Sequence, residues 1–436
     1  MEFFRKKILA DDFLRHTGIM VAGTGLINIF NLVYQLALVR LLSVVEYGIL
    51  NSLIAMMMVF SQFTVPFRPI LARSFAVSVA KGQMNRARDL FRRATLDLSI
   101  IAVLIFLVFV LGRFPLARYQ QIDDPFYIIL VGILIGLATV ALVPAAFLWG
   151  TQRFFSLAGL MASATFLKLV IGLILVWLGL KVSGAVGGYI ITPLVFLIMG
   201  YVVINLSRDD RQENSLSGPP ISMLSIYKHF IPTGIALFAF TVMTNFDVIL
   251  VKHFFLPRQA GYYSVAQMVG KIILFFPGAV SVVVFPKSAA AQVTNMTSSR
   301  FLKKGLVIVI LFDIVAFIIC ALAPSFVLRI LTGKNDPESI RLVPWFALAM
   351  SFYALTWLGV FYNLSIHNIR FIIPLAVIAL LQTAVIYLYH PTLRSVLAVL
   401  NISAIISFAA TLVLSKSKNR PVPFRDIENA EISGDH

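Results

Sequence analysis

The sequence is 436 residues long, 59% hydrophobic and 13% charged, with a mean hydropathy of +0.92 and a formal net charge of +17. This composition is too apolar for a soluble globular domain and places the chain in a lipid bilayer. The basic excess needs no nucleic-acid partner, because positively charged cytoplasmic loops of a membrane protein account for it. The single cysteine, Cys320, excludes a disulfide within the chain and a cysteine metal site.

Apolar blocks of about twenty residues recur along the chain, each long enough to cross roughly 30 Å of hydrocarbon as a helix. The N-terminal segment "MEFFRKKILADDFLRH" is expected to be retained, because the apolar run after it is far longer than the core of a signal peptide. The pattern predicts an all-α polytopic membrane protein without a large soluble domain. In chain order the blocks predict about twelve spans, at 16–39, 46–68, 94–112, 125–149, 155–179, 184–205, 229–251, 261–286, 305–328, 342–362, 370–389 and 395–415.

Lysine and arginine in the connecting segments set the expected orientation, since cytoplasmic loops are enriched in both. With the N-terminus inside, the inner segments hold about 23 basic residues and the outer loops about 10. Both termini are therefore expected in the cytoplasm, and the chain is expected to be a multi-pass protein of the cytoplasmic (inner) membrane.

A weak internal repeat divides the chain into two halves. The stretch "LVRLLSVVEYGILNSLIA" at 38–55 is echoed by "LVKHFFLPRQAGYYSVA" at 250–266, so that Arg40 answers Lys252 and Gly48 answers Gly261. Six spans separate the copies, and parallel repeats of this kind form two lobes related by an axis along the membrane normal. The alternative is chance similarity between apolar segments. The predicted organisation is a six-helix lobe at 1–205, a cytoplasmic linker at 206–228, a second six-helix lobe at 229–415 and a cytoplasmic tail at 416–436.

A polar stripe marks the first span, where Asn28, Asn31 and Gln35 lie on one helix face with Thr24. Such a stripe should not face lipid. It either forms hydrogen bonds between helices or lines a hydrated cavity. The seventh span carries Asn245 and Asp247, and Asp247 precedes Lys252 by five residues as Gln35 precedes Arg40, which favours a cleft shared by both lobes.

Ionisable residues deep in a span are costly, at about 2.5–3.5 kcal/mol each at a helix centre, and are therefore candidates for function. Lys168 lies near the middle of the fifth span and Lys271 in the middle third of the eighth, and a functional role is favoured for both. Asp313 lies within the ninth span; it and Asp247 are candidates for ion coupling, with a structural role equally open. Arg68 either contributes to the site or extends its side chain to the inner interface.

The segments "LVRLLSVVEYGILNSLIAMMMVFSQF", "LWGTQRFFSLAG" at 148–159 and "NFDVILVKHFFLPRQAGYYSVAQMVGKIILFFPGAVSVVVFPKSAA" at 245–290 resemble the Wzx-type polysaccharide flippases. These form the polysaccharide transporter family of the multidrug/oligosaccharidyl-lipid/polysaccharide exporter superfamily, the MOP or MATE-like superfamily. The resemblance covers essentially all twelve spans, and its motifs are degenerate. It implies a V-shaped pair of six-helix lobes that alternate between inward-open and outward-open states.

The resemblance also implies a substrate, an undecaprenyl-diphosphate-linked oligosaccharide repeat unit moved to the outer leaflet for O-antigen, capsule or exopolysaccharide biosynthesis. An anionic diphosphate with a sugar headgroup suits positive charge from Lys168, Lys271 and Arg68, and hydrogen bonds from Asn28, Asn31, Gln35 and Asn245. Expected partners are this lipid-linked substrate, membrane lipid, a coupling proton or sodium ion, and the polysaccharide polymerase machinery.

Two related activities remain as alternatives. A cation-coupled multidrug exporter should have acidic residues dominating its cavity, whereas lysines stand out here, although Asp247 and Asp313 keep this reading open. Flippases of the peptidoglycan precursor lipid usually carry two more spans than the twelve that this sequence predicts.

An enzyme is not expected. The outer loops are short, and their only adjacent acidic pair, Asp123-Asp124, precedes a proline that begins a helix. The six histidines are scattered without metal-ligand spacing, and no nucleotide-binding motif is present. The sequence therefore predicts neither a metal site nor a cofactor, and leaves an ion gradient or the substrate gradient as the energy source.

Overall fold

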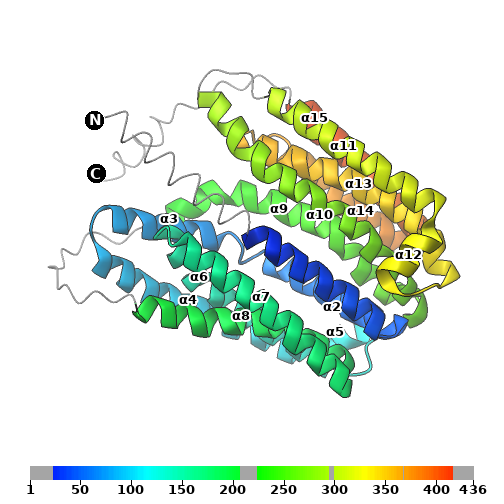
Figure 1. Cartoon of the computed structure of the whole chain (residues 1–436), viewed down its shortest axis with the longest axis horizontal. Coiled ribbons are helices and arrows are strands. Elements are labelled where there is room, and N and C mark those ends of the chain that lie inside the picture. The colour runs from blue at the N-terminus through cyan, green and yellow to red at the C-terminus, as the bar shows by residue number, and fades with distance from the viewer. Residues whose placement is uncertain (1–22, 207–222, 294–298, 367, 416–436) are drawn as a thin grey trace.

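A computed structural model (Figure 1) describes residues 23–206, 223–293, 299–366 and 368–415, and over these ranges the chain is helical with short connections. The first part begins with the helix Gly23–Leu41. It continues with α2 (Val44–Ser61), α3 (Phe67–Ala80), α4 (Met84–Leu111), α5 (Arg113–Tyr119), α6 (Phe126–Gly150), α7 (Phe154–Leu175), the π-helical turn η1 (Val176–Leu180) and α8 (Lys181–Leu206).

The second part contains α9 (Met223–Phe254), α10 (Pro257–Val293), α11 (Ser299–Leu322), α12 (Pro324–Thr332), α13 (Pro337–Ser365), α14 (Ile372–Leu388) and α15 (Leu393–Ser415). In Figure 1 the helices up to α8 and the helices from α9 onward form two groups that lie side by side. We call them the N lobe and the C lobe. They meet where α2 packs against α9 and α10.

The helices have the dimensions and surfaces that a bilayer requires. Within the described residues, nine helical stretches are long and apolar enough to span a membrane, and Ile372–Leu388 is a shorter apolar helix. One of these stretches, Phe154–Ile204, contains both α7 and α8. Large apolar side chains stay exposed on the helix surfaces, for example Leu111 at 79% and Leu322 at 83%, as expected where lipid replaces water. The chain is therefore an all-α polytopic membrane protein.

Each of the twelve predicted spans overlaps a long helix of the structure. Twelve crossings, as such, stay a prediction. The N-terminal residues 1–22, most of the predicted linker (207–222) and the tail (416–436) lie outside the described residues. The placement of both termini and of the linker in the cytoplasm therefore also stays a prediction.

The second predicted span, 46–68, is interrupted in the structure. Helix α2 ends at Ser61, a turn follows in which the Thr64 and Val65 amides donate to the Ser61 carbonyl, and α3 begins at Phe67. Pro66 lacks an N–H group and restricts the residue before it, so the helix cannot continue smoothly through this position. Arg68 consequently belongs to α3, which packs on α6.

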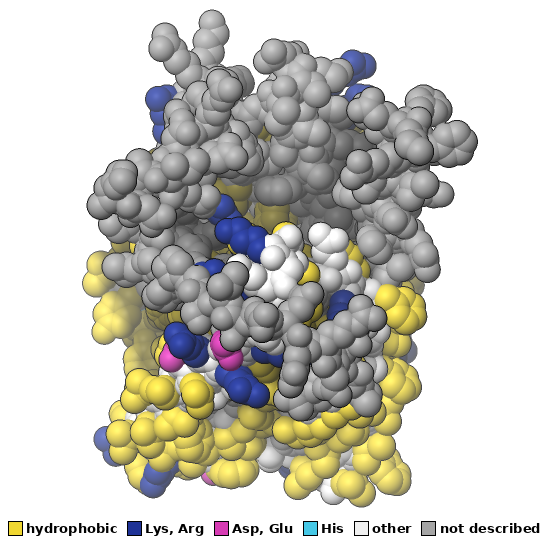
Figure 2. All heavy atoms as spheres, turned by 90° about the vertical axis from the view of Figure 1, so that its left-hand side faces the viewer, with side chains coloured by type: hydrophobic (Ala, Val, Ile, Leu, Met, Phe, Trp, Pro, Cys, Tyr) yellow, Lys and Arg dark blue, Asp and Glu magenta, His cyan; other side chains and the backbone are white. Residues whose placement is uncertain are grey.

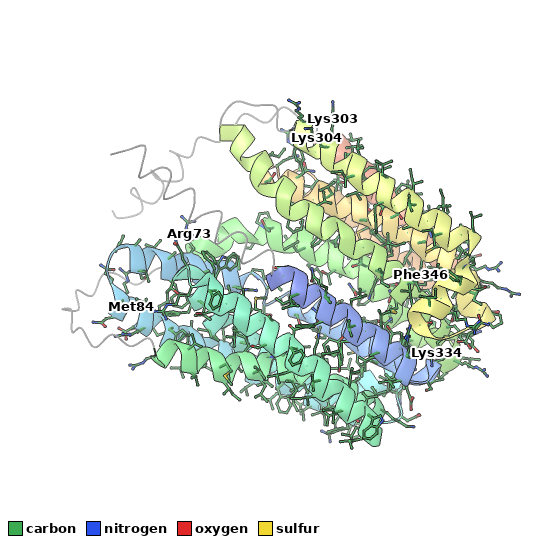
Figure 3. The ribbon with its side chains drawn as sticks, in the orientation of Figure 1. Arg73, Met84, Lys303, Lys304, Lys334 and Phe346 are labelled. Atoms are coloured by element: carbon green, nitrogen blue, oxygen red, sulfur yellow. The ribbon has the colours of Figure 1, made fainter. Side chains whose placement is uncertain are left out.

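Basic side chains gather at one end of the molecule. Figure 2 views this end and shows more dark-blue Lys and Arg side chains than magenta Asp and Glu. Figure 3 places Arg73 and Met84 of the N lobe, and Lys303 and Lys304 of the C lobe, toward this end, with Lys334 at the other. We call these two ends the basic end and the far end.

The glycines of the sequence repeat contact each other between the lobes. A methyl group on Gly48 would lie 2.9 Å from the Gly261 Cα atom, and one on Gly261 would lie 2.3 Å from the Val44 carbonyl oxygen. No side chain fits at either position, so α2 and α10 approach backbone to backbone. The repeat therefore places its two glycines at the junction of the lobes.

Candidate functional site

In the N lobe, the polar stripe of the first helix faces neighbouring helices. The Lys168 ammonium on α7 donates a hydrogen bond to the Asn31 amide oxygen. The Gln35 side-chain amide donates to the Tyr189 hydroxyl at 2.9 Å, and the Tyr47 hydroxyl donates to the Gln35 amide oxygen at 3.3 Å. Asn28 lies exposed on the same helix. The structure thus joins two of the four predicted stripe residues, Asn31 and Gln35, to α2, α7 and α8.

Lys168 is buried against two aromatic rings. The residue is only 5% exposed, and its ammonium nitrogen lies 5.2 Å from the ring centre of Tyr34 and 4.8 Å from that of Tyr189. Aromatic faces attract cations electrostatically, most strongly where water is excluded. Among the described residues no carboxylate pairs with this lysine. The cation is therefore held by neutral groups, and its charge is not cancelled.

Tyr34 is fixed in a slot between α7 and α8. Its hydroxyl donates to the Ala185 carbonyl at 2.8 Å, and its ring meets that of Tyr189 edge to face at 5.4 Å. A methyl group on Gly172 would lie 2.3 Å from the Tyr34 hydroxyl oxygen, and one on Gly188 would lie 2.2 Å from it. Two glycines therefore make the room in which the tyrosine supports Lys168.

Replacing Gly188 with alanine is expected to lower the free energy of unfolding by about 1–3 kcal/mol, because the added methyl group overpacks the slot. Thermal unfolding in detergent measures the effect. Gly159→Ala is the matched control, since nothing lies within 4 Å of a methyl group there, and alanine is the better helix former. Equal melting temperatures for the two variants would show that Tyr34 is not held in this slot.

In the C lobe, Lys271 repeats the pairing of a lysine with an asparagine. Its ammonium on α10 donates to the Asn245 amide oxygen on α9 at 3.0 Å. The Asn245 amide nitrogen in turn donates to the Thr241 carbonyl and the Thr244 hydroxyl, both at 3.0 Å. Within the described part of the chain, Lys271 forms no ion pair with a carboxylate. Each lobe thus contains one lysine held by an asparagine oxygen.

Asp247 belongs to a buried network that crosses between the lobes. One carboxylate oxygen accepts hydrogen bonds from the Tyr263 hydroxyl at 2.7 Å and the Gln267 amide at 3.1 Å. The Gln267 oxygen accepts from the Asn51 amide on α2 at 2.9 Å, so the network links the C lobe to the N lobe. The other carboxylate oxygen of Asp247 is buried without a partner among the described residues. Gln35 and Asp247, equivalent in the repeat, both accept from a tyrosine on the next helix.

The two remaining predicted residues lie apart from these networks. The Arg68 guanidinium lies 5.3 Å from the Trp149 ring centre, with one terminal nitrogen 4.0 Å from the Met161 sulfur. Asp313 on α11 is 4% exposed, and neither of its carboxylate oxygens has a partner among the described residues. Arg68 therefore packs within the N lobe, and Asp313 within the C lobe.

The sequence assigned no role to several residues of these networks: Tyr34, Tyr47, Asn51, Tyr189, Tyr263 and Gln267. Tyrosines are enriched at both membrane interfaces, and nothing in their spacing separates a supporting ring from an interfacial one. Gln267 shares a helix face with Lys271, one turn away. That spacing was the available signal for it.

The comparisons identify both a family and a fold. Residues 13–292 match the family "Polysaccharide biosynthesis protein". No curated protein sequence gives a significant match. Among solved structures, the chain is similar to an inward-facing multidrug resistance MATE family transporter of the MOP superfamily, with a TM-score of 0.66 at 12% identity, covering 94% of this chain and 96% of that one.

Two further structures show the same architecture. The lipid II flippase MurJ in an inward closed conformation gives a TM-score of 0.63 at 15% identity, over 95% of this chain and 90% of that one. An outward-facing MATE family transporter gives 0.58 at 13% identity, over 92% and 94%. At these identities the likeness shows the fold alone. Because the family match covers more than half of the sequence, the chain belongs to the polysaccharide biosynthesis protein family, with the MATE-like fold of the MOP superfamily.

Proposed function

We propose that this protein is a flippase that moves an undecaprenyl-diphosphate-linked oligosaccharide repeat unit across the cytoplasmic membrane by alternating access. The product would serve O-antigen, capsule or exopolysaccharide biosynthesis. In the proposed orientation, the basic end and both termini are cytoplasmic, as the enrichment of Lys and Arg there favours. The family supports polysaccharide biosynthesis, and the fold supports transport.

The observation that carries this proposal is the pair of lysines held by neutral oxygens. Lys168 and Lys271 donate to Asn31 and Asn245, and neither forms an ion pair with a carboxylate among the described residues, although the Asp247 carboxylate interacts electrostatically with Lys271. Lys168 is buried and Lys271 is half-buried, and charged side chains inside a membrane are costly and often mark a substrate path. A diphosphate supplies the missing negative charge, and charge-assisted hydrogen bonds to phosphate are among the strong ones. We propose that the two lysines bind this group from opposite lobes.

The remaining polar residues suit the sugar. Asn28 is exposed, and Asn31, Gln35 and Asn245 present amide groups that can exchange their present partners for sugar hydroxyls. Arg68 adds a third cation on the N-lobe side. In this proposal the polyprenyl chain stays in the lipid beside the lobes, so only the headgroup crosses the polar interior.

Ion coupling is proposed at the two buried aspartates. Asp247 has one oxygen and Asp313 two without a partner among the described residues, so each can accept a proton or contribute oxygen to a sodium ion. Of the two, Asp247 is the better placed, because its network reaches α2 of the other lobe. A change in its charge would therefore act directly on the contact between lobes.

The proposal predicts the effect of deleting the gene that encodes this chain in the cell that produces it. Surface polysaccharide should be lost, and lipid-linked repeat units should accumulate on the cytoplasmic leaflet, with both reversed by the cloned gene. Polymer staining and mass analysis of extracted lipids measure this. Unchanged polymer with increased drug sensitivity would instead support a multidrug exporter, and arrest of cell-wall synthesis would support a flippase of the peptidoglycan precursor.

A further inference from the structure

At the far end, the lobes are joined by hydrogen bonds from side chains to backbone carbonyl groups. The Arg40 guanidinium, at the end of the first helix, donates to the Ile330 carbonyl near the C-terminus of α12. In return, the Lys334 ammonium, just after α12, donates to the Leu42 carbonyl at 2.8 Å (Figure 3). Each lobe thus gives one cation to a carbonyl of the other. We call these four residues the first clasp.

A second set of contacts joins the lobes in the reverse sense. The Lys252 ammonium, near the end of α9, donates to the Gln121 carbonyl in the turn after α5 at 3.2 Å. The Gln121 side chain donates back to the His253 carbonyl at 2.6 Å. The His253 ring also stacks on Tyr119, with ring centres 3.8 Å apart. We call Lys252, His253, Gln121 and Tyr119 the second clasp.

The two clasps are related by the sequence repeat. Arg40 and Lys252 occupy the same place in its two copies. Arg40 reaches a carbonyl in the last turn of the short helix α12, and Lys252 reaches one in the turn after the short helix α5, each in the opposite lobe. Both turns contain a left-handed residue, Gln121 at φ 48° and Gly333 at φ 68°. Two equivalent contacts on either side of a two-fold axis can close a passage symmetrically, which one contact cannot.

We infer that the two clasps form the outer gate of the transport pathway, and that Arg40, Lys334 and Gln121 are positioning residues that set how often it opens. This inference rests on the proposed function for its direction of transport. The acceptors are neutral carbonyls, so the clasps are weaker than buried ion pairs and can break in every cycle. Releasing the substrate to the outer leaflet requires them to break.

The test measures the distance between the lobes at the far end by electron spin resonance. Spin labels at Leu111→Cys and Leu322→Cys, in a Cys320→Ser background, report on exposed positions at the far ends of α4 and α11. The clasp variant combines Arg40→Gln, Lys334→Gln and Gln121→Ala. Lys252 is kept because it is buried, so replacing it would also remove the desolvation cost of its charge and change stability independently of the clasp. Arg258→Gln with Arg394→Gln removes two other exposed cations of the C lobe as the matched control.

We expect the ratio of the long to the short distance to rise about threefold for each hydrogen bond lost, and about thirtyfold for the three together if they act independently. The control should match the unmodified protein. A clasp variant that carries Arg40→Lys in place of Arg40→Gln should regain part of the population at the short distance. Identical distance distributions in the clasp variant and the control would overturn the gate. If the clasp variant shifts to the long distance but the unmodified protein moves no lipid-linked sugar, the gate stands and the proposed function is contradicted.

Discussion

Export of polysaccharide is expected to fall at least tenfold when Lys168 or Lys271 is replaced by methionine, and to be lost when both are replaced. Each substitution removes a charge-assisted contact to the diphosphate, for which about 1.5–3 kcal/mol is typical, and two such losses exceed a hundredfold in binding. Methionine keeps the length and the apolar stem of lysine. Surface polymer in a strain lacking the chromosomal gene measures the effect, with expression checked in the membrane fraction.

Folding should suffer little in these variants. Removing the buried Lys168 or the half-buried Lys271 relieves a desolvation cost, which offsets the hydrogen bond lost at Asn31 or Asn245. The expected melting temperatures are therefore close to that of the unmodified protein, and Lys81→Met, an exposed lysine, is the matched control. Lys168→Arg should remain defective, because the wider guanidinium must fit between Tyr34 and Tyr189. Full export by the well-expressed double variant would show that the lysines do not bind substrate.

Replacing Gly261 with alanine is expected to open the lobes at the far end and to reduce transport at least tenfold. The new methyl group would lie 2.3 Å from the Val44 carbonyl oxygen and 2.6 Å from a Val44 methyl group, and backbone at this contact cannot move aside without separating α2 from α10. A protein that cannot close its far end cannot complete a cycle. The spin-label pair at positions 111 and 322 measures the opening.

Gly25→Ala is the control for this substitution, because nothing lies within 4 Å of a methyl group at that position of the first helix. It should leave both distance and transport unchanged. If Gly261→Ala kept the short distance and full transport, the close approach of the repeat glycines would not be part of the closed state.

The sequence was most informative where lipid constrains it. Because a helix must be about twenty apolar residues long to span the bilayer, each predicted span overlaps a long helix. Hydropathy did not reveal two breaks, one before α3 at Pro66 and one at Ala323, where α11 ends and α12 begins at Pro324 inside the predicted span 305–328. The same logic identified Lys168 and Lys271, since an ionisable residue in mid-span stands out against its neighbours. Such a pattern gives the position of a residue along its own helix, but not its partners on other helices.

Partners across helices were beyond the sequence. The stripe containing Asn31 and Gln35 was identified, but the lysine that binds Asn31 and the tyrosines around Gln35 come from other helices. The acceptors of Arg40 and Lys252 are backbone carbonyls, which every residue possesses, so no residue type marks them. The repeat indicated which positions of the two lobes are equivalent. Only the structure showed that Gly48 and Gly261 meet at the junction of the lobes.

The most direct test of the account is leaflet exchange of an intact lipid-linked sugar in vesicles that contain only this protein. Undecaprenyl-diphosphate carrying a galactose-terminated oligosaccharide is placed in both leaflets, and galactose oxidase added outside modifies the molecules it can reach. The account predicts that modification proceeds beyond the outer half toward completion, that the lipid stays chemically intact before oxidation, and that the Lys168→Met and Lys271→Met double variant stops at the outer half. Modification that stops at the outer half with the unmodified protein, with or without an imposed proton or sodium gradient, would contradict it.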